Sequence, residues 1–219
     1  MPTIKIDQAI KNALPNIKLG CIEASVVIKP SSENQTDWIN KQLGKLEVAM
    51  TAETIRQTNS VKATKDAYRA LGKDPNRYRP AAESLMRRIA NGKGLYQISN
   101  AVDVLNYISI KTGFSICGYD KNLISGDICL GKGNPDEPYD GIGRGMVNIE
   151  LLPVFRDNKG AFGTPTSDST RTMITEKTKQ ILYIFLSFDG DDELNNALTE
   201  TSELLENYAQ ATDINIFYI

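Results

Sequence analysis

Residues 62–93, KATKDAYRALGKDPNRYRPAAESLMRRIANGK, constrain the fold more than any other part of the chain. Apolar residues recur at helical spacing up to Leu71, and Gly72 suits a helix C-terminal cap, so a helix is predicted over residues 60–71. An Asp74-Pro75 turn follows. Pro80 is well placed as the first residue of a second helix, which Asn91-Gly92 would end. The segment therefore predicts two helices joined by a rigid loop.

The same segment is basic, although the chain as a whole is acidic. It contains nine Lys and Arg residues and three acidic residues, whereas the full chain has 25 basic and 27 acidic residues. The segment thus carries +6, and the rest of the chain carries −8. A local cationic cluster on an acidic protein predicts a site for an anion, and RNA is the obvious candidate. The candidate phosphate contacts are Lys65, Arg69, Arg77, Arg79, Arg87 and Arg88.

A structural interpretation of these residues competes with the RNA interpretation. Tyr68 and Tyr78 interleave with the cations and could stack on an unpaired base, but Tyr68 also fits the buried side of its helix. Arg79 lies close in sequence to Glu83, which favours an internal ion pair. The sequence pI of about 5.4 argues against broad, non-specific affinity for RNA.

The remaining pattern predicts helices that are segregated from mostly antiparallel strands, which is an α+β fold in a single domain over residues 1–219. Helical patterns cover residues 8–14, 33–56, 101–111 and 192–208. Strand patterns cover residues 3–6, 17–29, 114–119, 127–130, 147–155, 161–162, 180–188 and 215–219. The strongest of these is QILYIFLSF at 180–188, which is continuous, apolar and rich in β-formers.

The composition excludes several classes of chemistry. The chain has no histidine, which removes the usual Ser-His-Asp and Cys-His machinery. Its three cysteines, Cys21, Cys117 and Cys129, are odd in number and widely spaced, so we expect neither a disulfide framework nor a metal site. No apolar stretch approaches the roughly 20 residues that cross a bilayer, and MPTIKIDQAI lacks a signal-peptide core. We therefore expect a cytoplasmic protein without a metal or a cofactor.

Three segments taken together resemble a known family. They are KDAYRALGKDPNRYRPAAESLMRRI, ISNAVDVLNYISIKTGFSICGYD and SDSTRTMITEKTKQIL. They resemble the B3/B4 domain of the phenylalanyl-tRNA synthetase beta chain, and more closely the free-standing B3/B4-domain proteins, over about residues 20–219. Nothing in the chain resembles the aminoacylation module, so it is not a complete ligase. In the synthetase this domain removes tyrosine wrongly attached to the phenylalanine tRNA. The resemblance therefore implies a pocket for an amino acid or an aminoacyl ester, with tRNA or aminoacyl-tRNA as the partner.

The block VDVLNY supplies the first pocket candidates that the resemblance implies. Asn106 matches the family's pocket asparagine, whose amide can orient an ester carbonyl or a water. Its structural alternative is a helix residue bonded to nearby backbone. Asp103 lies three residues earlier and can share a helix face with Asn106. For Asp103 the interpretation as a first-turn residue favoured by the helix dipole is preferred.

The segment SICGYD contains the main departure from the family. Cys117 stands where the synthetase has its pocket histidine. A thiolate nucleophile is conceivable there, but no imidazole is present to activate it, and a small residue lining the pocket is the favoured alternative. Gly118 would leave room for a ligand. Asp120 is a second pocket candidate, or it bonds backbone in the turn.

The segment GTPTSDSTRT falls near the synthetase's glycine-rich stretch and the glutamate that follows it. Asp168 is therefore a candidate reader of the substrate side chain, with loop solvation or helix capping as the alternative. Arg171 could bind a carboxylate or phosphate bidentately, or it could pair with a neighbouring acid. The candidate catalytic residues are thus Asn106, Cys117 and Asp168, and the candidate substrate-pocket residues are Asp103, Gly118, Asp120 and Arg171.

Three hypotheses for function follow. The first is a trans-acting aminoacyl-tRNA deacylase, in which Asn106 and backbone amides hold the ester carbonyl while the ribose hydroxyl assists a water. The second is a non-catalytic module that binds RNA or an amino acid. The third is a small-molecule hydrolase that uses Cys117. The sequence leaves open which of them applies, and it does not give the oligomeric state.

Overall fold

The computed structural model describes residues 3–190 and 193–219. This part of the chain contains the α-helices α1 (Gln8–Ala13), α2 (Glu33–Glu47), α3 (Ala52–Gln57), α4 (Asn59–Leu71), α5 (Ala81–Ala90), α6 (Asn100–Thr112) and α7 (Glu193–Ala209). Two 3₁₀ turns, η1 (Lys121–Leu123) and η2 (Thr170–Thr172), lie between strands. None of the helices in the described residues is long and apolar enough to cross a membrane.

The strands form two four-stranded sheets and a small hairpin. The central sheet has the order β10-β2-β9-β3 and is antiparallel throughout. The second sheet has the order β1-β4-β7-β8, in which only the β1–β4 pair is parallel. The strands are β1 (Ile4–Ile6), β2 (Lys18–Ser25), β3 (Ser115–Asp120), β4 (Ile128–Lys132), β5 (Asp140–Gly141), β6 (Gly145–Met146), β7 (Pro153–Asp157), β8 (Gly160–Gly163), β9 (Gln180–Ser187) and β10 (Thr212–Tyr218).

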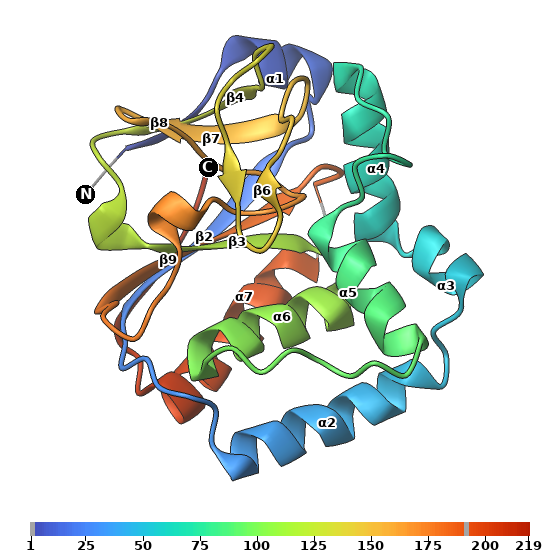
Figure 1. Ribbon diagram of the computed structural model, residues 1–219, viewed down its shortest axis with the longest axis vertical. Helices are drawn as coiled ribbons and strands as arrows, with labels where there is room; N and C mark the ends of the chain where they lie inside the picture. The colour runs from blue at the N-terminus through green and yellow to red at the C-terminus, as the bar shows by residue number, and fades with distance from the viewer. Residues whose placement is uncertain (1–2, 191–192) are drawn as a thin grey trace.

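The molecule has three layers, with the central sheet in the middle (Figure 1). One face of that sheet packs on α2, α5, α6 and α7, through residues such as Ile22 and Phe185. The other face packs on the second sheet, through Leu19 and Ile184. Because apolar residues of β9 face both layers, the strand is buried along almost its whole length, which explains its continuous apolar run. The α+β class and the mostly antiparallel pairing are as predicted.

The helix ends follow the local signals in the sequence. Asp7 accepts a hydrogen bond from the Ile10 amide and caps α1, and Ser32 accepts one from the Gln35 amide and caps α2. Gly72 takes a left-handed conformation with a φ of 93° after α4, which glycine adopts at little cost. Pro80 and Asn91 bound α5. The two helices of residues 62–93 and their loop are therefore as predicted.

Several predicted elements differ in extent from the structure. The strand predicted over 17–29 ends at Ser25, and the strand predicted over 215–219 begins at Thr212. The helical pattern at residues 33–56 is two helices rather than one, because Thr51 and Thr54 form a reciprocal capping box that starts α3. The predicted strand at 147–155 begins only at Pro153, and residues 150–151 form a turn in which Leu151 has a φ of 65°. The predicted start of the last helix at Asp192 lies outside the described residues. The hairpin β5–β6 was not predicted, because its glycine-rich sequence indicates only a loop.

Candidate functional site: a basic cavity beside α5

A cavity of about 460 Å³ lies where α5, α6, the hairpin β5–β6 and the loop before η2 meet. Five basic side chains and no acidic one line it. The basic residues are Arg79, Arg87, Arg88, Lys93 and Arg144. The volume is in the range of small-molecule sites, and the charge favours an anionic ligand.

A buried carboxylate fixes one side of this cavity. Glu83 of α5 is almost inaccessible, and its Oε1 accepts a hydrogen bond from Nε of Arg87 at 2.9 Å. Nε of Arg79 lies 3.7 Å from the same oxygen, and Nζ of Lys65 lies 3.4 Å from Oε2. One carboxylate thus serves three cations, which leaves this cluster with a net positive charge.

The other cavity cations have no carboxylate partner within 4 Å among the described residues. Arg88 donates to the carbonyl oxygens of Gly94 and Lys93, at 2.8 and 3.0 Å, and its guanidinium covers the ring of Tyr96. Lys93 and Arg144 are exposed and make no ion pair with a described residue. The side chains of Lys93 and Arg144 are therefore available to bind an anion.

Asn106 lies on the wall of the basic cavity, as part of α6. Its side chain is half-buried, and its amide has no hydrogen-bond partner among the described residues. An amide in this position can donate to and accept from a ligand at the same time. Thr166 and Ser167, from the loop before η2, add hydroxyl groups to the same wall.

Asp168 follows this wall directly but is not part of the lining. Its Oδ2 accepts a hydrogen bond from the Gly118 amide at 2.9 Å, whereas its Oδ1 is inaccessible to solvent and has no partner in the described chain. The residue as a whole is half-buried. Burial of the carboxyl group raises the pKa of Asp168 to about 7.

Cys117 lies behind Asp168 and is buried. Its thiol approaches the carbonyl oxygen of Thr164 at 3.6 Å. Burial and the negative charge of Asp168 raise the pKa of the Cys117 thiol well above its usual value. A nucleophilic cysteine needs the thiolate and access to the substrate. These surroundings provide neither, so they favour the structural interpretation of Cys117.

The structure places the predicted pocket residues Asp103, Gly118, Asp120 and Arg171 in internal contacts. Asp103 accepts from Oγ of Ser31 at 2.6 Å and from the Ile98 amide at 2.9 Å, and burial raises its pKa. The space beside Gly118 is filled by Leu105, whose Cδ1 would lie 2.6 Å from an added Cβ. Neither Asp103 nor Gly118 is part of the cavity lining.

Asp120 and Arg171 are likewise paired within the protein. Asp120 accepts from the Asn122 amide at 3.0 Å and from Oγ1 of Thr178 at 2.8 Å. Arg171 forms a bidentate pair with Asp157, with N–O distances of 2.9 and 3.1 Å. For both residues the structure agrees with the internal alternative that the sequence left open.

The six predicted phosphate contacts divide into two groups of three. Arg79, Arg87 and Arg88 line the basic cavity. Lys65 is buried against Glu83, Arg69 pairs with Asp66 at 2.5 Å, and Arg77 is exposed outside the lining.

The two tyrosines of the basic segment make contacts within the protein. The hydroxyl group of the buried Tyr68 forms a hydrogen bond with Oγ1 of Thr166, as expected for a core residue. Nζ of Lys73 lies 3.6 Å from the centre of the Tyr78 ring.

The lining residues that sequence reasoning did not select include Lys93, Tyr96 and Arg144, which carry its remaining cations and its aromatic ring. Lys93 was counted in the basic segment but was not selected as a contact. Arg144 belongs to a glycine-rich loop whose neighbouring charged residues are acidic, so nothing in the sequence links it to α5. Among the described residues no group of three or more Asp, Glu or Cys side chains is arranged to hold a metal.

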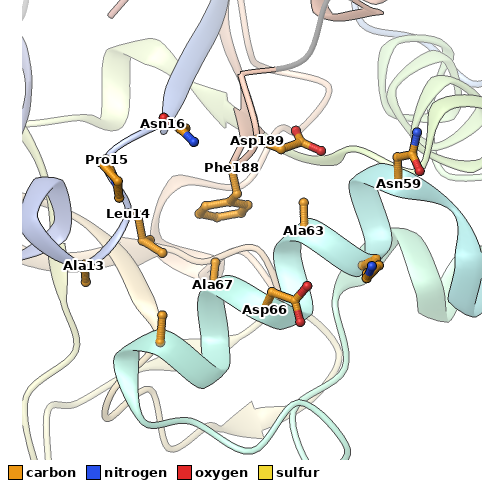
Figure 2. Close-up of a pocket in the computed structure, with 12 residues that line it drawn as sticks. Ala13, Leu14, Pro15, Asn16, Asn59, Ala63, Asp66, Ala67, Phe188 and Asp189 are labelled. Atoms are coloured by element: carbon orange, nitrogen blue, oxygen red, sulfur yellow. The ribbon is translucent and has the colours of Figure 1, made fainter.

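A second cavity, of about 440 Å³, lies between the α1–β2 loop and α4. Figure 2 shows the ring of Phe188 between Leu14 and Ala63 in this cavity. Its lining carries both signs of charge, and one of its acids, Asp66, already pairs with Arg69. The second cavity therefore lacks the preference for anions that distinguishes the basic cavity.

The sequence and the structure were compared with those of known proteins. No curated protein matches the sequence. A crystal structure of an N-terminal fragment of the phenylalanyl-tRNA synthetase beta-subunit from Pyrococcus horikoshii is similar, with 13% sequence identity and a TM-score of 0.49. The similarity covers 99% of this chain and 53% of that chain, so this chain spans about half of that fragment's length.

The family model of the B3/4 domain matches residues 63–210, which is more than half of the chain. The match contains α5, Asn106, Asp168 and Arg144, and the whole lining of the basic cavity falls within the family region. The wider extents predicted from the sequence, 20–219 for the resemblance and 1–219 for the domain, stay predictions. By this match, the chain belongs to the B3/4 domain family.

Proposed function

We propose that this protein binds the aminoacyl end of a tRNA in the basic cavity and hydrolyses the aminoacyl ester there. One observation carries the proposal: Asn106, the pocket residue implied by the resemblance, lines the same cavity as five cations and no acid. The cations suit the phosphates of the RNA end, and the amide suits the ester group. Activity of this kind belongs to the synthetase domain that the sequence resembles.

The lining restricts how hydrolysis would proceed. The ionisable side chains of the lining are those of arginine and lysine, together with the phenol of Tyr96. The lining therefore contains no carboxylate, thiol or imidazole that could act as a general base. We assign that role to the ribose hydroxyl next to the ester. It would accept a proton from the attacking water while it passes its own proton to the ribose oxygen that leaves, so that the free amino acid and the uncharged tRNA end are released. Asn106 would donate a hydrogen bond to the carbonyl oxygen and stabilise the charge that develops on it.

The same restriction favours a second candidate, a module that binds aminoacyl-tRNA without hydrolysing it. The test incubates the protein with phenylalanine tRNA mischarged with tyrosine, and with a panel of correctly charged tRNAs. Loss of the amino acid and binding of the tRNA are measured in parallel. Hydrolysis above the buffer rate supports the first candidate. Binding without hydrolysis supports the second, and neither binding nor hydrolysis by the folded protein contradicts both.

A further inference from the structure

Arg88 and Tyr96 form a stacked pair on the wall of the basic cavity. The guanidinium carbon of Arg88 lies 3.6 Å from the centre of the Tyr96 ring. The Nε and Nη2 groups of Arg88 donate hydrogen bonds to the carbonyl oxygens of Gly94 and Lys93. These bonds hold the α5–α6 loop against α5, so the pair is organised before any ligand arrives, which reduces the entropy cost of binding.

The pair presents a flat surface that the protein itself does not cover. Tyr96 is 54% exposed although it lines a cavity and packs against Arg88. An exposed cation–π pair contributes little to stability, so stability alone is a weak reason for this arrangement. Tyrosine rings and guanidinium planes are the groups on which proteins stack unpaired bases.

Two cationic side chains of the same cavity are placed to bind a phosphate group. Lys93 and Arg144 are exposed and have no carboxylate within 4 Å in the described parts of the chain. Lys93 also contributes one of the carbonyl oxygens that hold Arg88, so it lies next to the stacked pair. Phosphate bound by these cations would lie in the same cavity as a base stacked on Tyr96.

We propose that the Arg88–Tyr96 pair is a stacking site for an unpaired nucleobase at the end of an RNA, and that Lys93 and Arg144 bind the phosphate of that nucleotide. This inference rests on the proposed function and adds the chemical class of the group recognised. A base inside a duplex keeps both faces stacked on its neighbours and cannot use this surface. The site therefore selects RNA ends with unpaired nucleotides over blunt duplexes.

The first test compares adenosine 5′-monophosphate with ribose 5-phosphate by calorimetric titration of the whole protein. We expect Tyr96→Ala to weaken binding of the nucleotide about tenfold, the size of one stacking interaction, and to leave binding of ribose 5-phosphate unchanged. Arg144→Ala should weaken both ligands. Tyr96→Phe should retain binding, because stacking needs only the ring. Tyr218→Ala is the matched control, since Tyr218 is 51% exposed and lies on β10, outside the cavity lining.

Equal affinity of the wild-type protein for the two ligands, or no effect of Tyr96→Ala, would overturn the inference. No detectable nucleotide binding at millimolar concentration would overturn it as well. A second arm distinguishes an RNA end from a free nucleotide. A hairpin RNA with an unpaired 3′ tail should displace the nucleotide, and the same hairpin with a blunt end should not. If neither hairpin displaces it, the assignment to RNA is wrong.

These outcomes are separable from the proposed hydrolysis. Base stacking without any ester hydrolysis would leave this inference standing and contradict the deacylase. Hydrolysis that is unaffected by Tyr96→Ala, with no difference between the two small ligands, would contradict the stacking site alone.

Discussion

Asp168 accepts a hydrogen bond from the backbone amide of Gly118, with 2.9 Å between Oδ2 and N. This bond ties the loop that carries Thr166 and Ser167 to the edge strand β3 of the central sheet. The loop forms one wall of the basic cavity. Asp168 therefore positions that wall from behind, without belonging to the lining itself.

The raised pKa of Asp168 predicts that the protein loses stability as the pH increases. The folded protein holds the proton up to a pH of about 7, whereas an unfolded aspartate releases it near 3.9. Within this window the folded state binds more protons, so the free energy of unfolding falls by up to about 1.4 kcal/mol per pH unit. Urea unfolding between pH 5 and 8 measures this slope. The absence of histidine removes the side chain that usually titrates there.

Asp168→Asn is the control for this pH dependence. The amide oxygen can still accept from Gly118, but the side chain no longer titrates, so the slope between pH 5 and 8 should become much shallower. Asp103, whose pKa is also raised by burial, contributes to what remains. A wild-type stability that is constant or increases over this range would contradict the assignment. An unchanged slope in the Asn variant would contradict it too.

Glu83→Gln should destabilise the protein by about 3–5 kcal/mol. The substitution leaves Lys65, Arg79 and Arg87 around a position that no longer carries a negative charge, and breaking a buried ion pair has this cost. Chemical denaturation measures the change. Glu53→Gln is the matched control, because its pair with Arg56 is exposed and should contribute less than about 1 kcal/mol. Equal effects of the two substitutions would show that the Glu83 cluster is not structural.

Gly163→Ala should destabilise the protein by about 1–3 kcal/mol through overpacking. A Cβ at this position would lie 1.7 Å from the hydroxyl oxygen of Tyr119, which is buried and has no hydrogen-bond partner in the described chain. Tyr119→Phe removes that oxygen and should be nearly neutral. The double variant should therefore recover only part of the loss, because Cζ of Tyr119 would still lie 2.6 Å from the added Cβ. Gly44→Ala, where nothing lies within 4 Å, should stabilise α2 slightly. Additive effects of the first two substitutions would contradict the contact.

Cys117 should be unreactive in the folded protein, whereas Cys129 should react with an alkylating reagent. Cys129 is exposed, and Cys117 is buried with a raised thiol pKa. Mass spectrometry after brief alkylation identifies the modified residue. Cys117→Ala should leave any ester hydrolysis within about twofold of the wild type. Rapid labelling of Cys117 with loss of activity would instead support the hydrolase that uses this thiol.

Local sequence signals predicted much of the fold. They failed where contacts between residues far apart in the sequence determine the structure. The caps at Asp7, Ser32 and Gly72 depend on a few neighbouring residues, so they could be recognised directly. The break between α2 and α3 was missed because the apolar spacing continues across Thr51. The parallel pairing of β1 with β4 places Ile4 opposite Ile128. A local sequence pattern cannot predict a pairing between residues so far apart in the chain.

The same division applies to the candidate site. Arg79, Arg87 and Arg88 could be predicted as a group because they share one helix and its leading turn. Their neighbour Arg144 comes from the hairpin β5–β6, and only the tertiary fold brings it to the cavity. Asp103 and Asn106 are close on the same helix, yet Asp103 bonds to Ser31 and Asn106 lines the cavity. Sequence spacing gives the helix face only approximately, and tertiary packing determines which of the two side chains lines the cavity.

The most direct test of the account compares Asn106→Ala with Asn16→Ala in a hydrolysis assay on tyrosine-charged phenylalanine tRNA. Asn16 lines the second cavity and serves as the matched control. We predict hydrolysis above the buffer rate for the wild type, a rate lower by at least about tenfold for Asn106→Ala through the loss of one stabilising donor, and no change for Asn16→Ala. Hydrolysis that survives Asn106→Ala unchanged would contradict the placement of the ester in the basic cavity.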